Sequence, residues 1–238
     1  MAKCPPCPKG ERAVSQPCPP DWSAIDQVFL DMDGTLLDLH FDNHFWLEYL
    51  PRHYAERHGM DEQQAREELY RRFAAVEGTL DWYCLDYWRR ELGVDIVALK
   101  HEIRHLIRVH ERVIELLDAL RARGKRLVLL TNAHRDSLNL KIRETGLDGH
   151  FDRVISSHDL GLAKEHPQFW PRLQSVEPFD PARSLLVDDN LSVLQTARAA
   201  GIAHLVAVRH PDSQRPERQA EGFCSVRGVG ELLDSLPQ

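Results

Sequence analysis

The sequence lacks any apolar run of the roughly 20 residues needed to cross a membrane, because charged residues interrupt each hydrophobic stretch sooner. Its N-terminus also lacks the apolar central segment of a secretory signal peptide. These absences argue against an integral membrane protein and against a secreted one. The sequence therefore predicts a soluble protein of the cytoplasm.

An excess of positive charge is absent as well. Lysine and arginine together number 30, against 37 aspartates and glutamates, which gives a formal net charge of −7. This balance argues against nucleic acid or an anionic membrane as a partner, because proteins that bind either one normally present a basic face. We expect a small-molecule partner, and the sequence leaves monomer and homodimer equally open. An acidic protein that handles phosphate has to supply positive charge locally, from a metal ion or a lysine.

Cysteine is sparse, and three of the five cysteines lie in a proline-rich N-terminal segment. The spacing of Cys4 and Cys7 is typical of zinc ligands. A structural zinc site needs four ligands, however, and this segment adds only Cys18 and no histidine. We therefore favour a flexible Pro/Cys-rich leader at residues 1–21 over a zinc knuckle. Cys84 and Cys224 lie apart and are interpreted as reduced structural thiols.

The remaining sequence has the composition of a globular chain, with 42% hydrophobic and 28% charged residues. Short apolar runs alternate with amphipathic helical segments such as 112–124 and 192–201. Apolar runs without polar alternation suit strands that are buried on both faces of a parallel sheet. The sequence thus predicts an α/β fold with a Rossmann-like, doubly wound parallel sheet. Its expected strands are 25–30, 125–130, 153–156, 184–187 and 203–208.

Residues 40–110 interrupt this alternation of strand and helix. They contain amphipathic helical patterns and no convincing strand, so we interpret them as a helical domain inserted between the first strand and the next one. This division leaves residues 22–39 and 111–238 as a discontinuous catalytic core. The helical segments expected in the insertion are 44–59, 61–76, 80–93 and 98–107.

Polar side chains follow the expected strands at the points where these strands end. In open α/β sheets, ligands bind outside the carboxyl ends of the strands, where the strand order reverses. Residues that are far apart in the sequence but follow different strands should therefore meet at one site. The residues in such positions are Asp31, Asp33, Thr131, Asn132, Lys164, Asp188 and Asp189.

The first pair, Asp31 and Asp33, has the spacing expected for phosphoryl transfer. Side chains two residues apart in an extended chain face the same way, so both carboxylates address one site. One carboxylate can attack phosphorus and form an aspartyl phosphate, while the other manages the proton of the leaving oxygen and then of water. Gly34 permits a sharp exit from the strand, and the Thr35 hydroxyl can brace a carboxylate.

Several acids beside a phosphate would repel it unless cations offset their charge. Mg²⁺ binds carboxylate and phosphate oxygens, and Lys164 can supply the remaining positive charge. Thr131 and Asn132 can donate hydrogen bonds to the phosphoryl oxygens. Each motif alone could equally be a turn, a helix cap or a solvated lysine. Their joint occurrence at strand ends favours a catalytic site.

The motifs resemble those of the haloacid dehalogenase-like (HAD) hydrolases. D-x-D-G-T, Thr-Asn, Lys-x-x-Pro and Asp-Asp occur in this order over residues 25–210. The resemblance implies magnesium-dependent phosphatase chemistry, with Asp31 as nucleophile and Asp33 as acid/base that also binds the metal through its backbone carbonyl. It places Thr131 and Lys164 at phosphate-binding positions. It makes Asp189 the expected direct metal ligand and leaves open whether Asp188 acts directly or through water.

The resemblance also implies that the insertion is a helical cap that closes over the site and recognises the leaving group. An acid at Asp33 excludes the true dehalogenase branch, which has none there. DMDGTLLDLHFDNHFW, TLDWYCLDYWRRELGVDI and LLTNAHRDSLNLKIRETGLDGHFD are similar more specifically to bacterial GMP/IMP 5′-nucleotidases. The leader has no counterpart in this resemblance.

The aromatic segments of the insertion allow two interpretations. If residues 80–88 form one helix, Trp82, Leu85 and Asp86 share a face with Arg89. Such aromatic residues can stack on a purine base, or they can form the core of a small helical domain. Polar side chains are the better candidates for substrate contact, because a core excludes them. These candidates are His40, Asp42, Asn43 and Asp86.

Three functions remain in competition at the level of sequence. The favoured one is a phosphatase of purine nucleoside 5′-monophosphates. The second is a phosphatase of a smaller metabolite, such as phosphoglycolate or a sugar phosphate, or a sugar-phosphate mutase. The third is a catalytically idle interaction protein, which the intact acidic and lysine motifs argue against.

Overall fold

The computed structural model describes residues 20–237. These residues form a six-stranded, fully parallel sheet with the strand order β3-β2-β1-β4-β5-β6. The order reverses between β1 and β4, which creates the switch point at which ligands bind in such sheets. The strands are β1 (Gln27–Leu30), β2 (Arg126–Thr131), β3 (Arg153–Ser156), β4 (Ser184–Asp188), β5 (His204–Val208) and β6 (Cys224–Val226).

Five of these strands were predicted to within two residues at each end, and the α/β fold is confirmed. The sixth strand, β6, was not predicted, because three residues that include a serine give no recognisable apolar run. Register explains the shared strand ends: Leu30 of β1 pairs with Leu129 of β2 and with Val187 of β4. The residues that follow these strands therefore emerge side by side.

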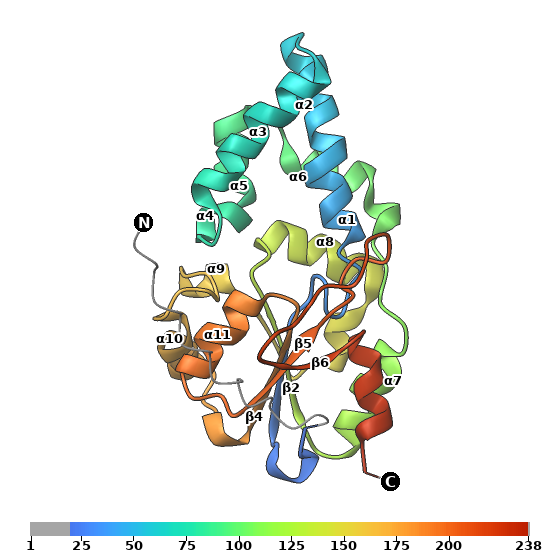
Figure 1. Ribbon diagram of the computed structural model, residues 1–238, viewed down its shortest axis with the longest axis vertical. Coiled ribbons are helices and arrows are strands. Elements are labelled where there is room, and N and C mark those ends of the chain that lie inside the picture. The colour runs from blue at the N-terminus through green and yellow to red at the C-terminus, as the bar shows by residue number, and fades with distance from the viewer. Residues whose placement is uncertain (1–19, 238) are drawn as a thin grey trace, which may run out of the picture.

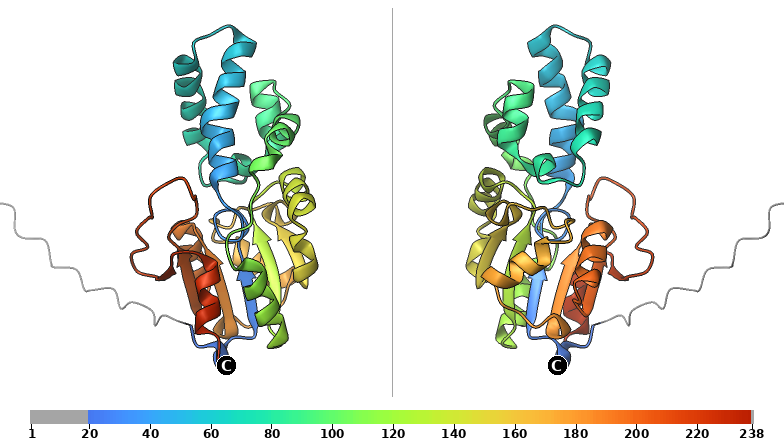
Figure 2. Two further views of the ribbon diagram at one scale, coloured as in Figure 1. Left: turned by 90° about the vertical axis from the view of Figure 1, so that its right-hand side faces the viewer. Right: turned by 90° about the vertical axis from the view of Figure 1, so that its left-hand side faces the viewer.

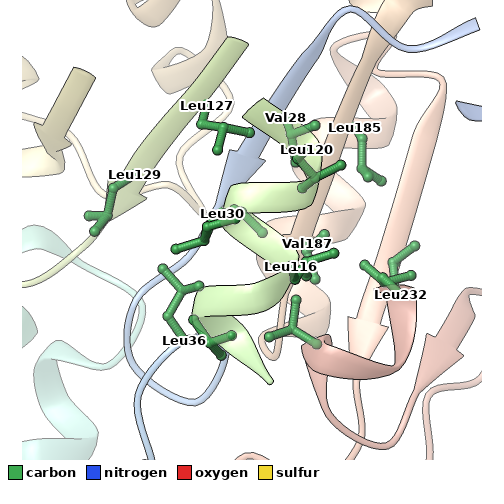
Figure 3. Close-up of a cluster of buried hydrophobic side chains, with 14 of the residues drawn as sticks. Val28, Leu30, Leu36, Leu116, Leu120, Leu127, Leu129, Leu185, Val187 and Leu232 are labelled. Atoms are coloured by element: carbon green, nitrogen blue, oxygen red, sulfur yellow. The ribbon is translucent and has the colours of Figure 1, made fainter. Parts of the chain in front are cut away.

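Two apolar layers sandwich the sheet. Val28 and Leu30 face one cluster, while Phe29 between them faces the other, which explains why β1 has no polar residue after Gln27. Figure 3 shows the first cluster, in which Leu116, Leu120 and Leu232 pack against the strands. The first layer contains α7 (Val113–Ala122) and the 3₁₀ segment η6 (Val229–Ser235). The opposite layer contains α10 (Phe169–Val176) and α11 (Leu191–Ala199).

Shorter elements complete the sheet region. α8 (Arg135–Thr145) follows β2 and lies close to the insertion, as Figure 1 shows. α9 (Ser157–Leu160) follows β3 directly, and Ser156 and Asp159 form a capping box at its start. The remaining 3₁₀ turns are η1 (Trp22–Ala24), η4 (Leu147–His150) and η5 (Pro181–Arg183).

Helices between residues 40 and 106, here called the cap helices, gather over one end of the sheet (Figures 1 and 2). Their apolar side chains form a third cluster, in which Trp88 is fully buried. They belong to the chain between β1 and β2, as predicted. The elements are α1 (His40–His44), η2 (Phe45–Tyr49), α2 (Leu50–His58), α3 (Glu62–Val76), α4 (Leu80–Tyr83), α5 (Leu85–Leu92), α6 (Ile96–Glu102) and η3 (Arg104–Leu106).

Two local features of the cap helices depart from the expected regular helices. The first helix runs continuously from α1 to α2, but its middle segment η2 is π-helical. Pro51 explains the change, because it has no N–H to donate to the carbonyl of Leu47. The expected single helix over 80–93 is wrong: Cys84 has extended dihedrals and separates α4 from α5. The predicted common face of Trp82 and Asp86 is therefore lost.

The cysteines divide between described and undescribed residues. Cys84 is a free thiol, as expected. Cys224 is disulfide-bonded, so the prediction of a reduced thiol there is wrong. Cys4, Cys7 and Cys18, together with the zinc interpretation, lie outside residues 20–237. Within that range, none of the helices combines the length and hydropathy required to span a bilayer.

Candidate active site

A cavity of about 560 Å³ lies at the carboxyl ends of the strands, between the sheet and the cap helices. Every residue that the sequence analysis assigned to catalysis, phosphate or metal contributes to its lining. The sheet register explains this convergence, since β1, β2 and β4 end at the same level. These lining residues are Asp31, Asp33, Thr131, Asn132, Lys164, Asp188 and Asp189.

Lys164 forms the centre of charge at the sheet end of the cavity. Its ammonium group donates to Asp31 at 2.6 Å, to Asp188 at 2.7 Å and to the carbonyl oxygen of Leu130 at 3.1 Å. The residue is only 1% exposed, so its charge could not persist there without these acceptors. The two carboxylates raise the pKa of Lys164 despite its burial, and the ammonium form is maintained.

Asp31, Asp188 and Asp189 carry more negative charge than two cations can offset: Lys164, which contacts Asp31 and Asp188, and Arg218, which donates to Asp189 at 3.2 Å. Each of the three places a carboxylate oxygen within 4.8 Å of the others. Burial first, and then repulsion from Asp188, raises the pKa of Asp31 to about 7 despite the attraction of Lys164. Burial, followed by Asp31 and Asp188, also raises the pKa of Asp189 well above its usual range. This cluster of hard oxygen donors, whose charge Lys164 and Arg218 offset only in part, fits a divalent cation such as Mg²⁺.

Gly34 allows the D-x-D-G-T motif to pack closely against Asp189 of the Asp-Asp motif. It has a φ of +89°, which is accessible to glycine but strained for other residues. A Cβ atom there would lie 2.8 Å from the Asp189 carboxylate and 2.9 Å from Pro211. The glycine of D-x-D-G-T is thus needed for both its backbone conformation and its lack of a side chain.

A second buried lysine, Lys141 of α8, holds Asp33. Its ammonium group lies 2.6 Å from a carboxylate oxygen of Asp33 and 2.6 Å from one of Asp42. The other oxygen of Asp42 accepts from Lys100 of α6 at 2.7 Å. Burial raises the pKa of Asp33 to about 6 even though Lys141 opposes the shift, while the two lysines lower the pKa of Asp42 to about 2.

The sequence analysis missed both Lys141 and Lys100. A signal existed in α8, because Lys141 lies one turn after Ser137 and Leu138 on the buried face of that helix. Lys100 had no comparable signal, since its partners Phe41 and Phe45, whose rings lie within 5 Å of its ammonium group, are more than 50 residues away in the sequence.

Thr131 and Asn132 end β2 beside the carboxylates. The Thr131 hydroxyl oxygen accepts from the backbone of Ala133 at 3.0 Å, so its proton remains free to donate. Asn132 donates to Glu165 at 2.8 Å and accepts from the Lys164 backbone at 2.9 Å. Glu165 also accepts from Tyr83 of α4 at 2.5 Å, so it links this loop to the cap helices. The role of Glu165 was not predicted.

Aromatic and apolar side chains line the cap end of the cavity. They include Trp46, Leu47, Trp82 and Leu85. Trp88, by contrast, is absent from the lining and lies in the core of the cap helices. The core interpretation is confirmed for Trp88, whereas Trp46 and Trp82 pack against that core and also line the cavity, so stacking on a base stays a prediction for them.

The four residues predicted to contact substrate fall into two groups, inside and outside the cavity lining. Asp42 and Asn43 line the cavity, and Asn43 donates to Asp212 at 2.6 Å. His40 is absent from the lining and lies 3.8 Å from Asp212. The Asp86 side chain is 72% exposed, also lies outside the lining, and is 3.6 Å from His134. The structure thus brings only two of these residues to the cavity.

The Thr35 hydroxyl does not brace a carboxylate as expected. Thr35 is fully buried, and its oxygen has no hydrogen-bond partner within residues 20–237. The turn at Gly34 directs Asp33 toward Lys141 instead.

Comparison with known sequences agrees with these motifs. Residues 25–201 match the family model of haloacid dehalogenase-like hydrolases. The chain is 40% identical over 215 residues to GMP/IMP nucleotidase YrfG of Escherichia coli (strain K12), which covers 90% of this chain and 97% of that protein. It is 32% identical over 193 residues to a phosphoglycolate phosphatase of Nitrosospira multiformis, covering 77% of this chain and 83% of the relative.

Solved structures share the fold. A HAD phosphatase from Thermococcus onnurineus superposes with a TM-score of 0.72 at 23% identity, covering 89% of this chain and 97% of its own. The HAD-hydrolase YfnB from Bacillus subtilis, in a form bound to magnesium, superposes with a TM-score of 0.62 at 19% identity. That alignment covers 90% of this chain and 99% of YfnB. At these identities the likeness extends to the fold alone.

Proposed function

Because this chain belongs to the haloacid dehalogenase-like hydrolases and is a phosphomonoester hydrolase, we propose that its substrates are purine nucleoside 5′-monophosphates, GMP or IMP. The observation that carries the proposal is a single cavity with charged groups at one end and tryptophans at the other. A relative at 40% identity that is named for these two nucleotides supports the same substrate class.

We assign the chemical steps to the first two acids. A carboxylate oxygen of Asp31 attacks phosphorus, the bond to the leaving oxygen breaks, and Asp33 gives its proton to that oxygen. In the second step Asp33 takes a proton from water, which attacks the aspartyl phosphate and releases inorganic phosphate and free Asp31. A pKa of Asp33 near 6 suits a group that has to act as acid and then as base near neutral pH.

Lys164, Thr131 and Asn132 are assigned to the phosphoryl group. Lys164 already touches the attacking carboxylate, so it can hold nucleophile and phosphate together. The free proton of the Thr131 hydroxyl and the amide of Asn132 face the same cavity. Their hydrogen bonds would stabilise the negative charge that gathers on the phosphoryl oxygens in the transition state.

Asp31, Asp188 and Asp189 would hold Mg²⁺, together with the backbone carbonyl of Asp33. When bound, the ion supplies charge neutralisation and orients the phosphate for attack. The carboxylate of Asp33 is not assigned as a metal ligand, because it forms a hydrogen-bonded ion pair with Lys141. The raised pKa values of Asp31 and Asp189 support the assignment, since a cation would relieve the repulsion that causes part of each shift.

The cap end is assigned to the nucleoside. Trp46 and Trp82 offer flat surfaces on which a purine can stack, and Asn43 and Asp42 are the nearby polar groups that the sequence favoured. We retain the division into a leader (1–21), a core (22–39 and 111–238) and a cap (40–110). A cytoplasmic location also belongs to the proposal, because nucleoside monophosphates are metabolites of that compartment.

A phosphatase of a smaller metabolite remains the second candidate. The phosphoglycolate phosphatase relative at 32% identity favours it. The size of the cavity and its aromatic wall argue for the nucleotide, because phosphoglycolate offers no surface for stacking.

Phosphate release measured over purine and pyrimidine nucleotides, sugar phosphates, phosphoglycolate and an aryl phosphate tests the proposal, with Asp31→Asn as the control. We expect the highest kcat/KM for GMP or IMP, and no activity in Asp31→Asn. A preference for phosphoglycolate would transfer the assignment to the second candidate. Equal activity of wild type and Asp31→Asn would overturn the proposed catalytic site itself.

A further inference from the structure

A second group of metal-ligating side chains shares no residue with the strand-end carboxylates, although His134 lines the same cavity. Cys84, His134 and His158 each place one ligand atom within 4.8 Å of the other two, and all three are partly buried. Cys84 separates α4 from α5 in the cap helices. His134 precedes α8, and His158 lies in α9. The group therefore sits where the cap helices meet the loops that follow β2 and β3.

The His158 ring is the strongest indication of a ligand. Its Nε2 atom is shielded from solvent and makes no hydrogen bond of good geometry with the described residues, although backbone groups of Asn132 and Tyr83 lie near the ring. Buried polar atoms are normally satisfied, so such an atom calls for a bound group. Burial, and then repulsion from His134, lowers the pKa of His158 to about 4. The ring is therefore neutral at pH 7, which is the form that binds metals.

The other two side chains are held loosely enough to rearrange. The Cys84 sulfur accepts only a backbone N–H of Tyr87 at 3.4 Å. Nδ1 of His134 accepts from the Asp136 backbone at 3.3 Å, and its Nε2 lies 3.6 Å from the Asp86 carboxylate. Metal-binding histidines are commonly supported by such a carboxylate. This gives Asp86 a position beside the cluster even though it lies outside the cavity lining.

We propose that Cys84, His134 and His158 form a zinc site that joins the cap helices to the sheet region. A sulfur with two imidazoles is a donor set for zinc rather than magnesium. Tetrahedral zinc places S and N ligands about 3.6 Å apart. The three ligand atoms, which now lie within 4.8 Å of one another, therefore have to approach by up to roughly 1 Å. A water molecule completes the fourth position, because zinc on Nδ1 of His134 leaves Asp86 as the acceptor for Nε2–H. Because His134 also lines the cavity, zinc bound here slows turnover.

Cobalt provides the decisive probe, because a thiolate ligand gives Co²⁺ a charge-transfer absorption that carboxylate ligands do not. The full chain is prepared with Cys4, Cys7, Cys18 and Cys224 replaced by serine, which leaves Cys84 as the sole cysteine. Co²⁺ is added with excess Mg²⁺, so that the strand-end carboxylates are occupied. We expect one Co²⁺ per chain with the thiolate band, and loss of the band when Cys84→Ser is added.

Zinc affinity, measured by competition with a chromophoric chelator, gives a second readout. We expect Cys84→Ser and His158→Gln each to weaken zinc binding by at least about 100-fold. Thermal melts check that both metal-free variants remain folded, and likewise the single-cysteine protein, which lacks the disulfide of Cys224. The proposal is overturned if the single-cysteine protein lacks the thiolate band, or if the band persists in Cys84→Ser.

The effect on turnover is measured with saturating Mg²⁺ and an aryl phosphate substrate. We expect zinc to inhibit the wild type at concentrations at least about 10-fold lower than those needed for Cys84→Ser. Equal inhibition of the two proteins would refute the regulatory role, because zinc would then act at the carboxylates.

Discussion

The two ends of the cavity are lined by different kinds of side chain. The sheet end consists of acids around Lys164, each fixed by the strand that precedes it. The cap end consists of Trp46, Trp82 and their apolar neighbours, which come from helices separated by loops. The sheet end is suited to chemistry on a phosphate, which every phosphomonoester substrate shares. The cap end differs in shape and polarity, so it is suited to selecting the rest of the molecule.

Lys141 and Lys100 lie where these two ends meet. Lys141 comes from the sheet region and Lys100 from the cap helices, and both bind Asp42. Lys141 also binds Asp33, so the proposed proton donor is connected through charged side chains to the cap helices. In the proposed assignment, chemistry and selection come from separate segments of the sequence, and one buried charge network joins those segments. The following variants test that separation.

Asp31→Asn should have the largest effect. An amide cannot attack phosphorus, so we expect phosphate release to fall by at least about 10⁴-fold for every substrate. Asp118→Asn, an exposed position on α7, serves as the matched control and should retain activity. A nucleotide-specific loss in Asp31→Asn would contradict the idea that the sheet end serves all substrates alike.

Asp189→Asn should weaken metal binding and at the same time stabilise the metal-free protein. Asp189 is buried beside Asp31 and Asp188, which raises its pKa in the folded state. Above the ordinary aspartate pKa, the unfolded chain ionises more readily than the metal-free fold, so the stability of that fold falls as the pH rises. We expect the variant to melt at a higher temperature than wild type in EDTA at pH 8. We also expect it to need at least about 10-fold more Mg²⁺ for activity. A lower melting temperature in EDTA would contradict this account of the site.

Lys141→Met should change the pH dependence of turnover. Removing the ammonium group raises the pKa of Asp33 above its present value of about 6. Because Asp33 acts first as an acid, the alkaline limb of kcat/KM should move to higher pH. Because it then acts as a base, kcat near neutral pH should fall by about 10-fold or more. Lys141→Arg should restore part of the profile, and an unmoved alkaline limb would rule out control of Asp33 by Lys141.

Trp82→Ala should affect selection more than chemistry. Stacking of a base on an aromatic ring contributes about 1–3 kcal/mol, so kcat/KM for GMP should fall by roughly 10-fold or more. A small aryl phosphate, which need not reach Trp82, should lose at most about 2-fold. Similar losses for both substrates would show that Trp82 supports the packing of the cap helices rather than the base.

The smallest effects are expected at the polar cap residues. Asn43 lines the cavity, so Asn43→Ala should raise KM for GMP by several-fold and leave the aryl phosphate nearly unchanged. Asp86 lies outside the lining and is exposed, so Asp86→Ala should change neither KM by more than about 2-fold in the absence of zinc. A large rise in KM for GMP in Asp86→Ala would mean that the nucleoside contacts Asp86, outside the cavity lining.

Much of the fold was predictable because its signals are local. The strand-forming runs are apolar and contain β-branched residues, and most are followed by helical sequence, so residue order alone indicates a parallel sheet. The family resemblance drawn from the motifs is also confirmed. The break at Cys84 and the strand β6 were missed, because neither has a distinct local pattern.

The sequence by itself determined the identity of the groups at the sheet end. Asp31 directly follows β1, Asp188 ends β4, and Asp33 lies two residues after Asp31. Backbone direction dictates that these neighbouring strands deliver their next residues to one place. Only the tertiary structure decided that Lys141 faces Asp33, that Trp82 lines the cavity while Trp88 is buried, and that Cys84 meets two histidines. These contacts join elements up to about a hundred residues apart, and helix packing, which short motifs do not encode, sets them.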